Sequence, residues 1–280
     1  FPATRHADDR LPHMIDTAGY STLHFDLLDD DTILRITIDR PDSAVNAVDE
    51  ALHHDLTRVF GALRTERELC AIVLTGSGGA FSAGGDFDWF PTLRTPERLA
   101  ALRVDAKTMI WDLLDIEVPI VAAIGGPAIG LGASIALLCD VIVAAEGVRI
   151  ADPHVKVGLV AGDGGAVIWP LVLGPALAKE YLLTGKPLLA EDAARLGLVN
   201  HVVPVGELAA TALDLARQIA ANPPLAVRYT KAAVNKGIRE RMETLFDYAS
   251  ALELSTFLSD DHAEAVAAAV ERRPPHFTGH

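Results

Sequence analysis

The sequence predicts an α/β fold: a mainly parallel sheet with helices on both faces, followed by a helical region. Short apolar runs occupy 70–75, 119–124 and 140–145, as is typical of strands buried on both faces. Segments of helical periodicity lie between these runs, and from residue 164 onward the pattern is mainly helical. Strand–helix–strand units of this kind build parallel or mixed sheets.

The elements follow in order along the chain. The run 32–38 alternates apolar and polar residues from Leu34 to Ile38, which predicts a half-buried strand. A helix is expected from about Asn46, a good N-cap, because apolar residues recur at three- and four-residue steps as far as Leu63. Further helices are predicted at 98–115, 133–139, 164–173, 175–184, 190–196, 206–221, 225–258 and 260–272.

Composition narrows the class of protein. Half of the 280 residues are apolar, which suits a packed domain, and the net charge of −14 argues against a nucleic-acid binder. Cys70 and Cys139 both lie in apolar runs, so we expect no disulfide framework, no metal site and a reducing cytoplasm. No unbroken apolar run is long enough to span a membrane. The expected organisation is an N-terminal extension with little order at 1–18, a core at 19–204 and a C-terminal helical region at 205–280.

Two glycine-rich loops each follow a predicted strand: "FSAGGD" (81–86) and "GGPAIGLG" (125–132). Ligands bind at the carboxyl ends of parallel strands, and glycines let the backbone approach them. Neither loop has the lysine of a phosphate-binding loop or the third glycine of a dinucleotide site, so a nucleotide enzyme is not expected. Ser134, in "GASIA", resembles a nucleophile elbow, but it does not directly follow its strand.

His154 and Asp163 stand in the glycine-rich stretch "ADPHVKVGLVAGDGG" (151–165). Neutral imidazole is basic near pH 7, and a carboxylate on its other nitrogen fixes the tautomer. We therefore predict His154 as general base and Asp163 as its orienting partner. The alternative is structural: His154 would cap a turn, and Asp163 would cap a helix beginning at Gly164.

Other residues are assigned more simply. Trp89 and Phe90 are expected to roof an apolar pocket, and Trp169 is expected to pack in the core. The remaining histidines that the patterns single out are expected at the surface: His53, His54, His201 and His262.

Several segments, taken together, resemble the crotonase (enoyl-CoA hydratase/isomerase) superfamily. They are "FSAGGDF", "VAAIGGPAIGLGASIALLCDVIVAAE", "GLVAGDGG", "LLAEDAARLGLVNHVVP" and "HAEAVAAAVERRPPHFTG". The resemblance implies a spiral of ββα repeats and a C-terminal helical region that builds trimers, often paired into hexamers. It also implies an acyl-CoA substrate, with no cofactor beyond the coenzyme A of that substrate, and no nucleic-acid or membrane partner.

The same resemblance implies roles for particular residues. The backbone N–H groups of Gly85 and Leu131 would hold a thioester oxygen, stabilising the enolate that forms. The coenzyme A channel would be lined by Ala44, Ala47, Ala83, Asp86 and Phe87. Its nucleotide end would meet Arg40, Arg272, Arg273 or Phe277.

The sequence departs from the family where a hydratase has two glutamates, because these positions fall at Ser134 and His154. The His154/Asp163 pair is more similar to the crotonase-fold β-diketone hydrolases, of the 6-oxocamphor hydrolase type, although a further histidine of that branch falls at Leu131. The leading hypothesis is an acyl-CoA enzyme that uses His154 and Asp163 for proton transfer. The alternatives are a C–C hydrolase acting on a cyclic β-diketone or a ring-containing acyl-CoA, and a non-catalytic binding or assembly subunit.

Overall fold

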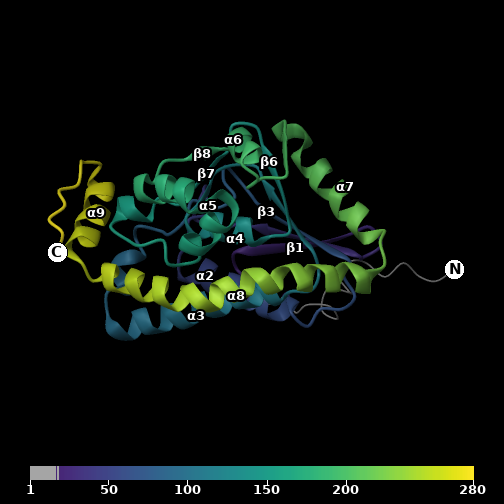
Figure 1. Cartoon of the computed structure of the whole chain (residues 1–280), viewed down its shortest axis with the longest axis horizontal. Coiled ribbons are helices and arrows are strands. Elements are labelled where there is room, and N and C mark those ends of the chain that lie inside the picture. Colours follow the sequence, from purple (N-terminus) through teal and green to yellow (C-terminus); the bar gives the residue numbers. More distant parts are fainter. Residues whose placement is uncertain (1–16, 18) are drawn as a thin grey trace.

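A six-stranded sheet forms the centre of the molecule, in a computed structural model that describes Thr17 and residues 19–280 (Figure 1). All neighbouring strands are parallel except the first pair, which is antiparallel. In spatial order the strands are β1 (Leu23–Leu28), β2 (Ile33–Ile38), β3 (Ala71–Gly76), β4 (Ile120–Ile124), β6 (Val141–Ala145) and β9 (His201–Val203). A smaller sheet joins β5 (Ala128–Ile129), β7 (Arg149–Ala151) and β8 (Leu188–Leu189).

The central strands bury both faces, as their apolar runs predict. Leu34, Ile72 and Ile120 are cross-strand neighbours, and all three belong to the main core. The alternate residues, such as Val73 and Val121, face a second core on the opposite side of the sheet. Side chains of successive residues point to opposite faces of a strand, so one set of strands supports two layers of helices.

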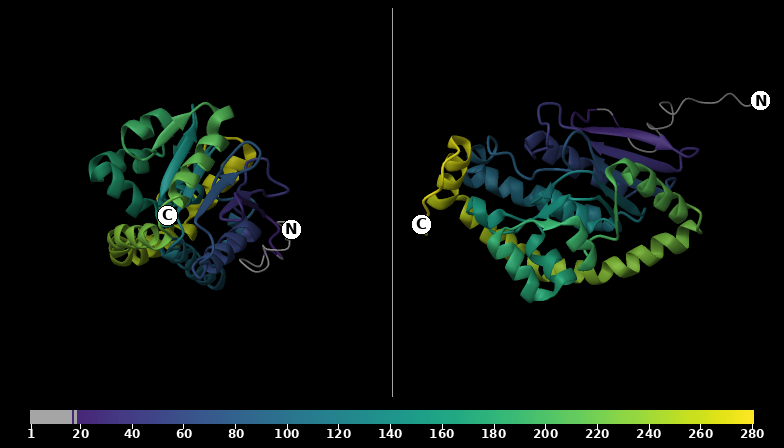
Figure 2. Two further views of the ribbon diagram at one scale, coloured as in Figure 1. Left: turned by 90° about the vertical axis from the view of Figure 1, so that its right-hand side faces the viewer. Right: turned by 90° about the horizontal axis from the view of Figure 1, so that it is seen from above.

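Helices enclose the sheet from both sides (Figures 1 and 2). The helix α7 (Leu208–Ala220) packs on the second core, while α2 (Glu50–Leu63) and α3 (Pro96–Asp115) contribute to the main core on the other face. The long helix α8 (Pro224–Phe257) runs beside α3 along the length of the molecule. The helices are α2 (Glu50–Leu63), α3 (Pro96–Asp115), α4 (Leu131–Leu138), α5 (Gly165–Thr184), α6 (Ala190–Arg195), α7 (Leu208–Ala220), α8 (Pro224–Phe257) and α9 (Asp260–Glu271). The described residues also form three 3₁₀ turns: η2 (Phe90–Leu93), η3 (His154–Val157) and η4 (Val205–Glu207).

The start of α2 differs from the prediction. Asp49 is the N-cap, and its side chain accepts a hydrogen bond from Leu52 N at 2.9 Å. Asn46 is instead buried with a φ of 50°, and its side-chain amide donates to the carbonyls of Ile38 and Ala80, each at 3.1 Å. Asn46 therefore ties two loops together. From the sequence alone, an asparagine in this role cannot be distinguished from a helix N-cap.

The helix α5 is broken at Gly174, where φ is 73° and ψ is 158°, which explains why the sequence predicts two helices. Among the described helices, α5 alone is long and apolar enough to be considered as a membrane span by length and composition. Ile168 and Trp169 in its first half are nevertheless buried in the main core. We therefore interpret α5 as a helix that packs on this protein.

Most predicted elements agree with the structure, and the predicted α/β class with a helical C-terminal region is confirmed. The strand β1 and the short strands β5, β7, β8 and β9 were not predicted. The expectation of little order at 1–18 falls, apart from Thr17, outside the described residues. Cys70 and Cys139 are both free, and Trp169 is fully buried, as expected.

Candidate active site

All four predicted catalytic residues line one small cavity. It has a volume of about 70 Å³ and lies where the loops after the central strands meet α2, α3 and α8. The lining is mostly apolar, with a cluster of ionisable side chains on one wall. The residues are Val48, His53, Gly85, Trp89, Phe90, Leu93, Leu102, Ala106, Leu131, His154, Leu159, Asp163, Glu253 and Phe257.

His154 is held through both ring nitrogens. It opens η3, and its Nδ1 is hydrogen-bonded to the carboxylate of Asp152, a buried residue that follows β7. Its Nε2 lies 3.5 Å from Asp163 Oδ2 and 3.9 Å from Glu253 Oε1. The carboxylate on the far nitrogen is thus that of Asp152, and Asp163 stands on the nitrogen that faces the cavity. This corrects the predicted arrangement, in which Asp163 was the orienting partner.

Asp152 is fixed by close packing. A Cβ added at Gly165 would lie 1.7 Å from Asp152 Oδ2, so only glycine fits beside this carboxylate. Asp152 Oδ2 is buried and has no hydrogen-bond partner within the described part of the chain. The sequence did not identify Asp152 as a site residue, because an Asp-Pro pair before a short turn is typical of an ordinary loop.

Asp163 is anchored by Ser134. The hydroxyl of Ser134 donates to Asp163 Oδ1 at 3.1 Å, and Ser134 is fully buried. The expected cap differs in position: α5 begins at Gly165 and its N-cap is Gly164, with a φ of 128°, but Asp163 Oδ1 does accept from the backbone N–H of Gly165, at 3.5 Å. Ser134 therefore fixes a carboxylate and is not placed as a nucleophile.

Glu253 is the catalytic candidate that sequence reasoning missed. It projects from α8 and lies 90 residues beyond Asp163 along the chain, so no local motif connects the two. A Cβ at Gly162 would lie 2.6 Å from Glu253 Cβ and Oε2, which shows how closely the loop before α5 packs on this side chain.

The charges in this cluster shift each other's pKa values. Burial alone would lower the pKa of His154, but the carboxylates of Asp152, Asp163 and Glu253 outweigh it and raise the pKa well above the ordinary value. Burial raises the pKa of Asp163, an effect that the charge of His154 opposes. Burial also raises the pKa of Glu253, to about 8. These shifts favour a protonated His154 and, below about pH 8, a protonated Glu253, and the protons belong to the group as a whole.

His53 also faces the cavity, contrary to the expectation of a surface residue. It is buried, and burial lowers its pKa to about 4, so the ring is neutral. Its neighbour His54 is exposed. The signal was present in the sequence, since His53 lies three and seven residues before Leu56 and Phe60, both of which are buried on the same helix face.

His262 is a second histidine wrongly expected at the surface, whereas His201 is exposed as predicted. His262 is buried on α9, and its Nδ1 donates to the carbonyl of Val157 at 2.7 Å. Val157 ends η3, so α9 braces the turn that carries His154.

The two predicted oxyanion donors, Gly85 and Leu131, lie in the same cavity. Leu131 is the first residue of α4, where the backbone N–H has no acceptor within the helix. Gly85 pairs with Val48 in an isolated bridge. Val48 N donates to Gly84 O at 2.7 Å and Asp86 N donates to Val48 O at 2.9 Å, so neither bond uses the N–H of Gly85. A Cβ at Gly85 would meet Phe90 Cζ at 2.3 Å, so a side chain here would close the cavity.

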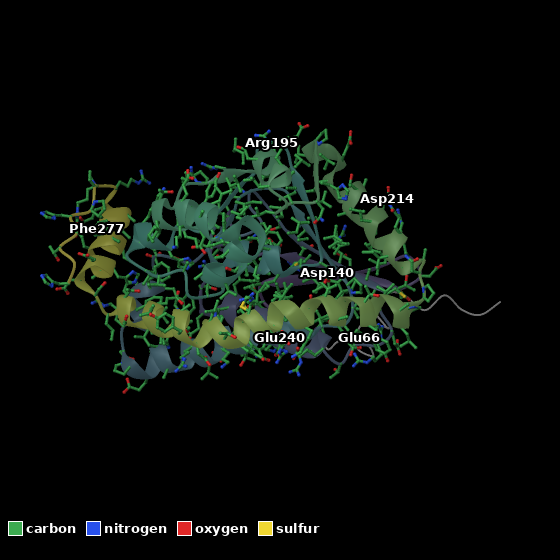
Figure 3. The ribbon with its side chains drawn as sticks, in the orientation of Figure 1. Glu66, Asp140, Arg195, Asp214, Glu240 and Phe277 are labelled. Carbon is green, nitrogen blue, oxygen red and sulfur yellow. The ribbon has the colours of Figure 1, made fainter. Side chains whose placement is uncertain are left out.

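The predicted coenzyme A contacts lie outside this cavity, and none of the five residues, Ala44, Ala47, Ala83, Asp86 and Phe87, belongs to its lining. The carboxylate of Asp86 is paired with Arg40, whose Nε also contacts Asp49 at 3.0 Å. Phe277, expected at the nucleotide end, lies in the segment after α9 at the C-terminal end of the molecule (Figure 3). The coenzyme A contacts stay a prediction.

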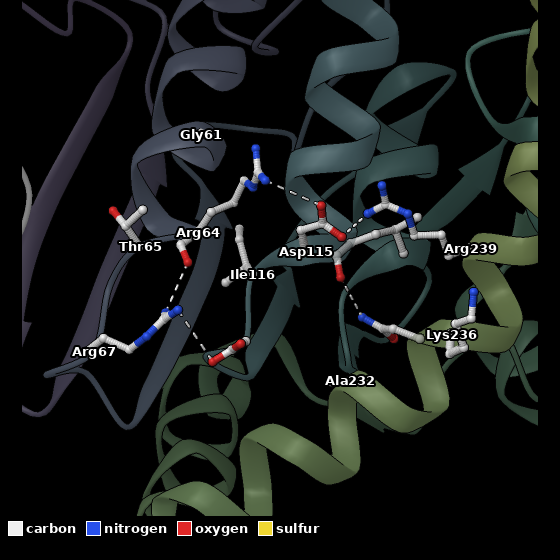
Figure 4. Close-up of a pocket in the computed structure, with 12 residues that line it drawn as sticks. Gly61, Arg64, Thr65, Arg67, Asp115, Ile116, Ala232, Lys236 and Arg239 are labelled. Carbon is white, nitrogen blue, oxygen red and sulfur yellow. Dashed lines mark hydrogen bonds and ion pairs between the residues drawn. The ribbon is translucent and has the colours of Figure 1, made fainter.

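A larger hollow of about 780 Å³ lies between the ends of α2 and α3 and the side of α8 (Figure 4). Most of its charged side chains are paired with one another: Asp115 contacts Arg64 and Arg239, and Arg67 contacts Glu117. No histidine, cysteine or serine is among the described residues that line it. We therefore place the chemistry in the smaller cavity.

The cluster also has the composition of a metal site. One ligand atom each from Asp152, His154 and Asp163 lies within 4.8 Å of the others. These are the same groups that the hydrogen-bond pattern uses to hold the ring of His154, and the sequence-based expectation of no metal remains a prediction.

Comparison with known proteins identifies the family. The model of the family described as enoyl-CoA hydratase/isomerase matches residues 29–280. The chain belongs to the enoyl-CoA hydratase/isomerase family. A probable enoyl-CoA hydratase of Mycobacterium bovis is 33% identical over 87% of this chain and 93% of its own length. The predicted membership of the crotonase superfamily is thereby confirmed, and the family is one of enzymes.

Solved structures of family members agree with this assignment. An enoyl-CoA hydratase/isomerase from Mycobacterium paratuberculosis superimposes with a TM-score of 0.83 at 38% identity, covering 88% of this chain and 98% of its own. A β-diketone hydrolase from the cyanobacterium Anabaena, bound to (S)-3-oxocyclohexyl acetic acid, gives a TM-score of 0.80 at 32% identity, covering 85% and 95%.

Proposed function

We propose that this enzyme hydrolyses a carbon–carbon bond of a compact cyclic β-diketone by a retro-Claisen reaction. The observation that carries the proposal is the surrounding of His154. Asp152 holds its Nδ1, and Asp163 and Glu253 stand at its Nε2, inside a cavity lined by two backbone donors. A histidine so placed suits the activation of water at a carbonyl carbon.

The first step is binding of one substrate carbonyl. Its oxygen would accept hydrogen bonds from the N–H groups of Gly85 and Leu131. As water adds to the carbon, charge grows on this oxygen, and fixed dipoles aimed at it stabilise the transition state. A lost donor of this kind typically costs about 10²–10³ in rate.

The second step is removal of a proton from the attacking water. The His154–Asp163 pair accepts this proton. It can do so only in its deprotonated form, so the pair must first have lost a proton to solvent. Asp152 fixes the ring by accepting from Nδ1 and stabilises the imidazolium that forms.

The third step breaks the bond between the attacked carbon and the carbon that separates the two carbonyls. The electron pair moves onto that central carbon, where the second carbonyl delocalises it as an enolate. Glu253, protonated near neutral pH, gives its proton to the central carbon, and the proton on His154 then returns to Glu253. The sum is one diketone and one water converted into one keto acid.

The size and charge of the cavity support this choice of substrate. The cavity is small, about 70 Å³, and mostly apolar, which supports a compact ring as the group bound there. No lysine or arginine is among the described residues that line it, and the carboxyl groups of Asp163 and Glu253 lie at one wall. These features favour a neutral ligand.

The second candidate is the hydration or isomerisation of an acyl-CoA, the leading hypothesis from the sequence. It is favoured by relatives such as the short-chain-enoyl-CoA hydratase of Clostridium acetobutylicum, 32% identical over 85% of this chain. Against it, Ser134 and His154 stand where the resemblance implies glutamates. Family membership favours either enzyme over a non-catalytic subunit.

The test compares two substrates. One is 2,2-dimethylcyclohexane-1,3-dione. The carbon between its two carbonyls carries no hydrogen, so the compound cannot form the stable, unreactive enolate of an ordinary 1,3-diketone. The other is crotonyl-CoA. We expect release of a keto acid from the diketone, measured by mass spectrometry, and a loss of about 10²–10⁴ in kcat for His154→Ala and Asp163→Asn.

The exposed His201→Ala serves as the matched control and should keep full activity. Hydration of crotonyl-CoA that both cavity variants leave unchanged would overturn the proposal, and so would a wild type inactive on the diketone.

We further propose assembly into trimers or hexamers in the cytoplasm. Large apolar side chains are exposed along α8, among them Tyr229, Val234 and Tyr248. Exposed apolar surface of this extent marks protein contacts. The two free cysteines suit a reducing compartment.

A further inference from the structure

One polar group in the cavity has no role in the mechanism above. The indole of Trp89 lines the cavity, and its Nε1–H is buried without a hydrogen-bond acceptor among the described residues. A buried donor left without a partner costs about 1–3 kcal/mol. Such a group in a native structure calls for an explanation, and a ligand that supplies the acceptor is one.

The position of Trp89 sets it apart from the other unpaired indole. The Nε1 of Trp169 is also buried without an acceptor, but Trp169 lies in the main core beside Tyr181 and does not line the cavity. Trp89 stands in the loop that carries Gly85, four residues further on. Its side chain is therefore supported by the same segment that supplies a predicted oxyanion donor.

The neighbour of Trp89 is uncharged. The ring of His53 lies against the indole, with centroids 5.6 Å apart, and burial keeps this imidazole neutral. Among the described residues that line the cavity there is no lysine or arginine, and the Trp89 N–H is left without an acceptor. A neutral carbonyl oxygen fits it better than a carboxylate or phosphate, which would need a positive partner.

We propose that the Trp89 indole N–H donates a hydrogen bond to a second carbonyl oxygen of the substrate. The inference rests on the proposed function: one carbonyl meets the N–H groups of Gly85 and Leu131, and the other meets Trp89. Trp89 is then a specificity-determining residue that selects compounds with two carbonyl groups over monoketones. In the bond-breaking step it also stabilises the enolate oxygen that develops on this second carbonyl.

The binding test follows the indole N–H itself. The chain has three tryptophans, so ¹⁵N-labelled protein gives three indole signals, of which that of Trp89 is identified by its loss in Trp89→Phe. The titration uses His154→Gln, which is expected not to turn the diketone over. We expect 2,2-dimethylcyclohexane-1,3-dione to shift the Trp89 signal and to bind about tenfold more tightly than 2,2-dimethylcyclohexanone, the matched monoketone.

The kinetic test uses two matched variants. Trp89→Phe keeps an aromatic ring and removes only the donor, and it should lower kcat/KM for the diketone by about tenfold. Trp111→Phe is the control, since Trp111 packs against Phe246 and does not line the cavity. It should leave the rate unchanged.

The outcomes separate the inference from the proposed function. Diketone cleavage that Trp89→Phe leaves intact, with no movement of the Trp89 signal, would overturn the inference and leave the function standing. A Trp89 signal that shifts with the diketone but not the monoketone, in a protein that cleaves neither, would overturn the function and support the inference. Equal binding of the two ketones by His154→Gln would count against Trp89 as the selecting residue.

Discussion

At the scale of single residues, the proton cluster predicts an unusual pH profile. The base form requires loss of a proton from the His154–Asp163 pair, and the pKa of His154 is raised well above its ordinary value. The acid form requires Glu253 to keep its proton, and its pKa is about 8. We therefore expect kcat/KM to rise with pH above the ordinary histidine range and to fall beyond about pH 8, giving a narrow optimum in steady-state assays.

The Asp152→Asn variant tests the origin of the rising limb. The change removes a negative charge beside His154 but keeps an oxygen that can accept from Nδ1. The pKa of His154 should fall, so the rising limb should move to lower pH by about 1–3 units, with a reduced maximal rate. A limb that does not move would show that another group limits the rate on the acid side.

The sequence predicts some of these residues and misses Glu253, and each outcome has a physical reason. His154, Asp163, Gly85 and Leu131 share a cavity because loops after parallel strands meet at one edge of the sheet. Glu253 reaches the same place from a helix far along the chain, through tertiary packing that no local pattern records.

At the scale of secondary-structure elements, the contact between the start of α5 and Asp152 is a sensitive point. In Gly165→Ala the new methyl group must displace the carboxylate that holds His154, since it would otherwise lie 1.7 Å from Asp152 Oδ2. We expect a loss of at least about tenfold in kcat together with a shift of the rising pH limb.

Gly237→Ala provides the matched control on α8. A Cβ there meets no atom within 4 Å, and glycine costs a helix interior about 1 kcal/mol relative to alanine. This variant should keep its activity and melt about 2–4 °C higher in calorimetry. If both variants lost activity alike, packing on Asp152 would not be the cause.

The elements themselves were predictable where one periodicity dominates. The buried strands β3, β4 and β6 agree with their apolar runs within a residue or two. The start of α2 was misplaced because Asn46 and Asp49 both have the side chain of a cap, and only tertiary contacts decide which one serves. The two-residue strands β5 and β8 are too short for any alternation to appear.

At the scale of the whole molecule, the exposed face of α8 predicts association. Leu245, Tyr248 and Leu252 recur at three- and four-residue steps and are all exposed, so they form one apolar stripe. Light scattering should give three or six times the mass of the chain. Tyr248→Glu with Leu252→Glu should lower that mass, while Lys236→Gln, at an exposed charged position on the same helix, should not. A wild type that elutes as a monomer would refute the prediction.

The anchoring of α8 connects the two ends of the molecule. Near its start, Arg228 donates to the carbonyls of Arg67 and Leu69, and Lys231 donates to that of Val118. Glu253 follows on the same unbroken helix, about 33 Å from Lys231 at 1.5 Å per residue. The contacts of Arg228 and Lys231 thus fix the position of Glu253 relative to the edge of the sheet where the central strands begin. A random-mutagenesis screen for lost turnover would recover substitutions at Arg228 and Lys231 beside those in the cavity, and distance from the bound substrate would be a poor guide to which changes matter.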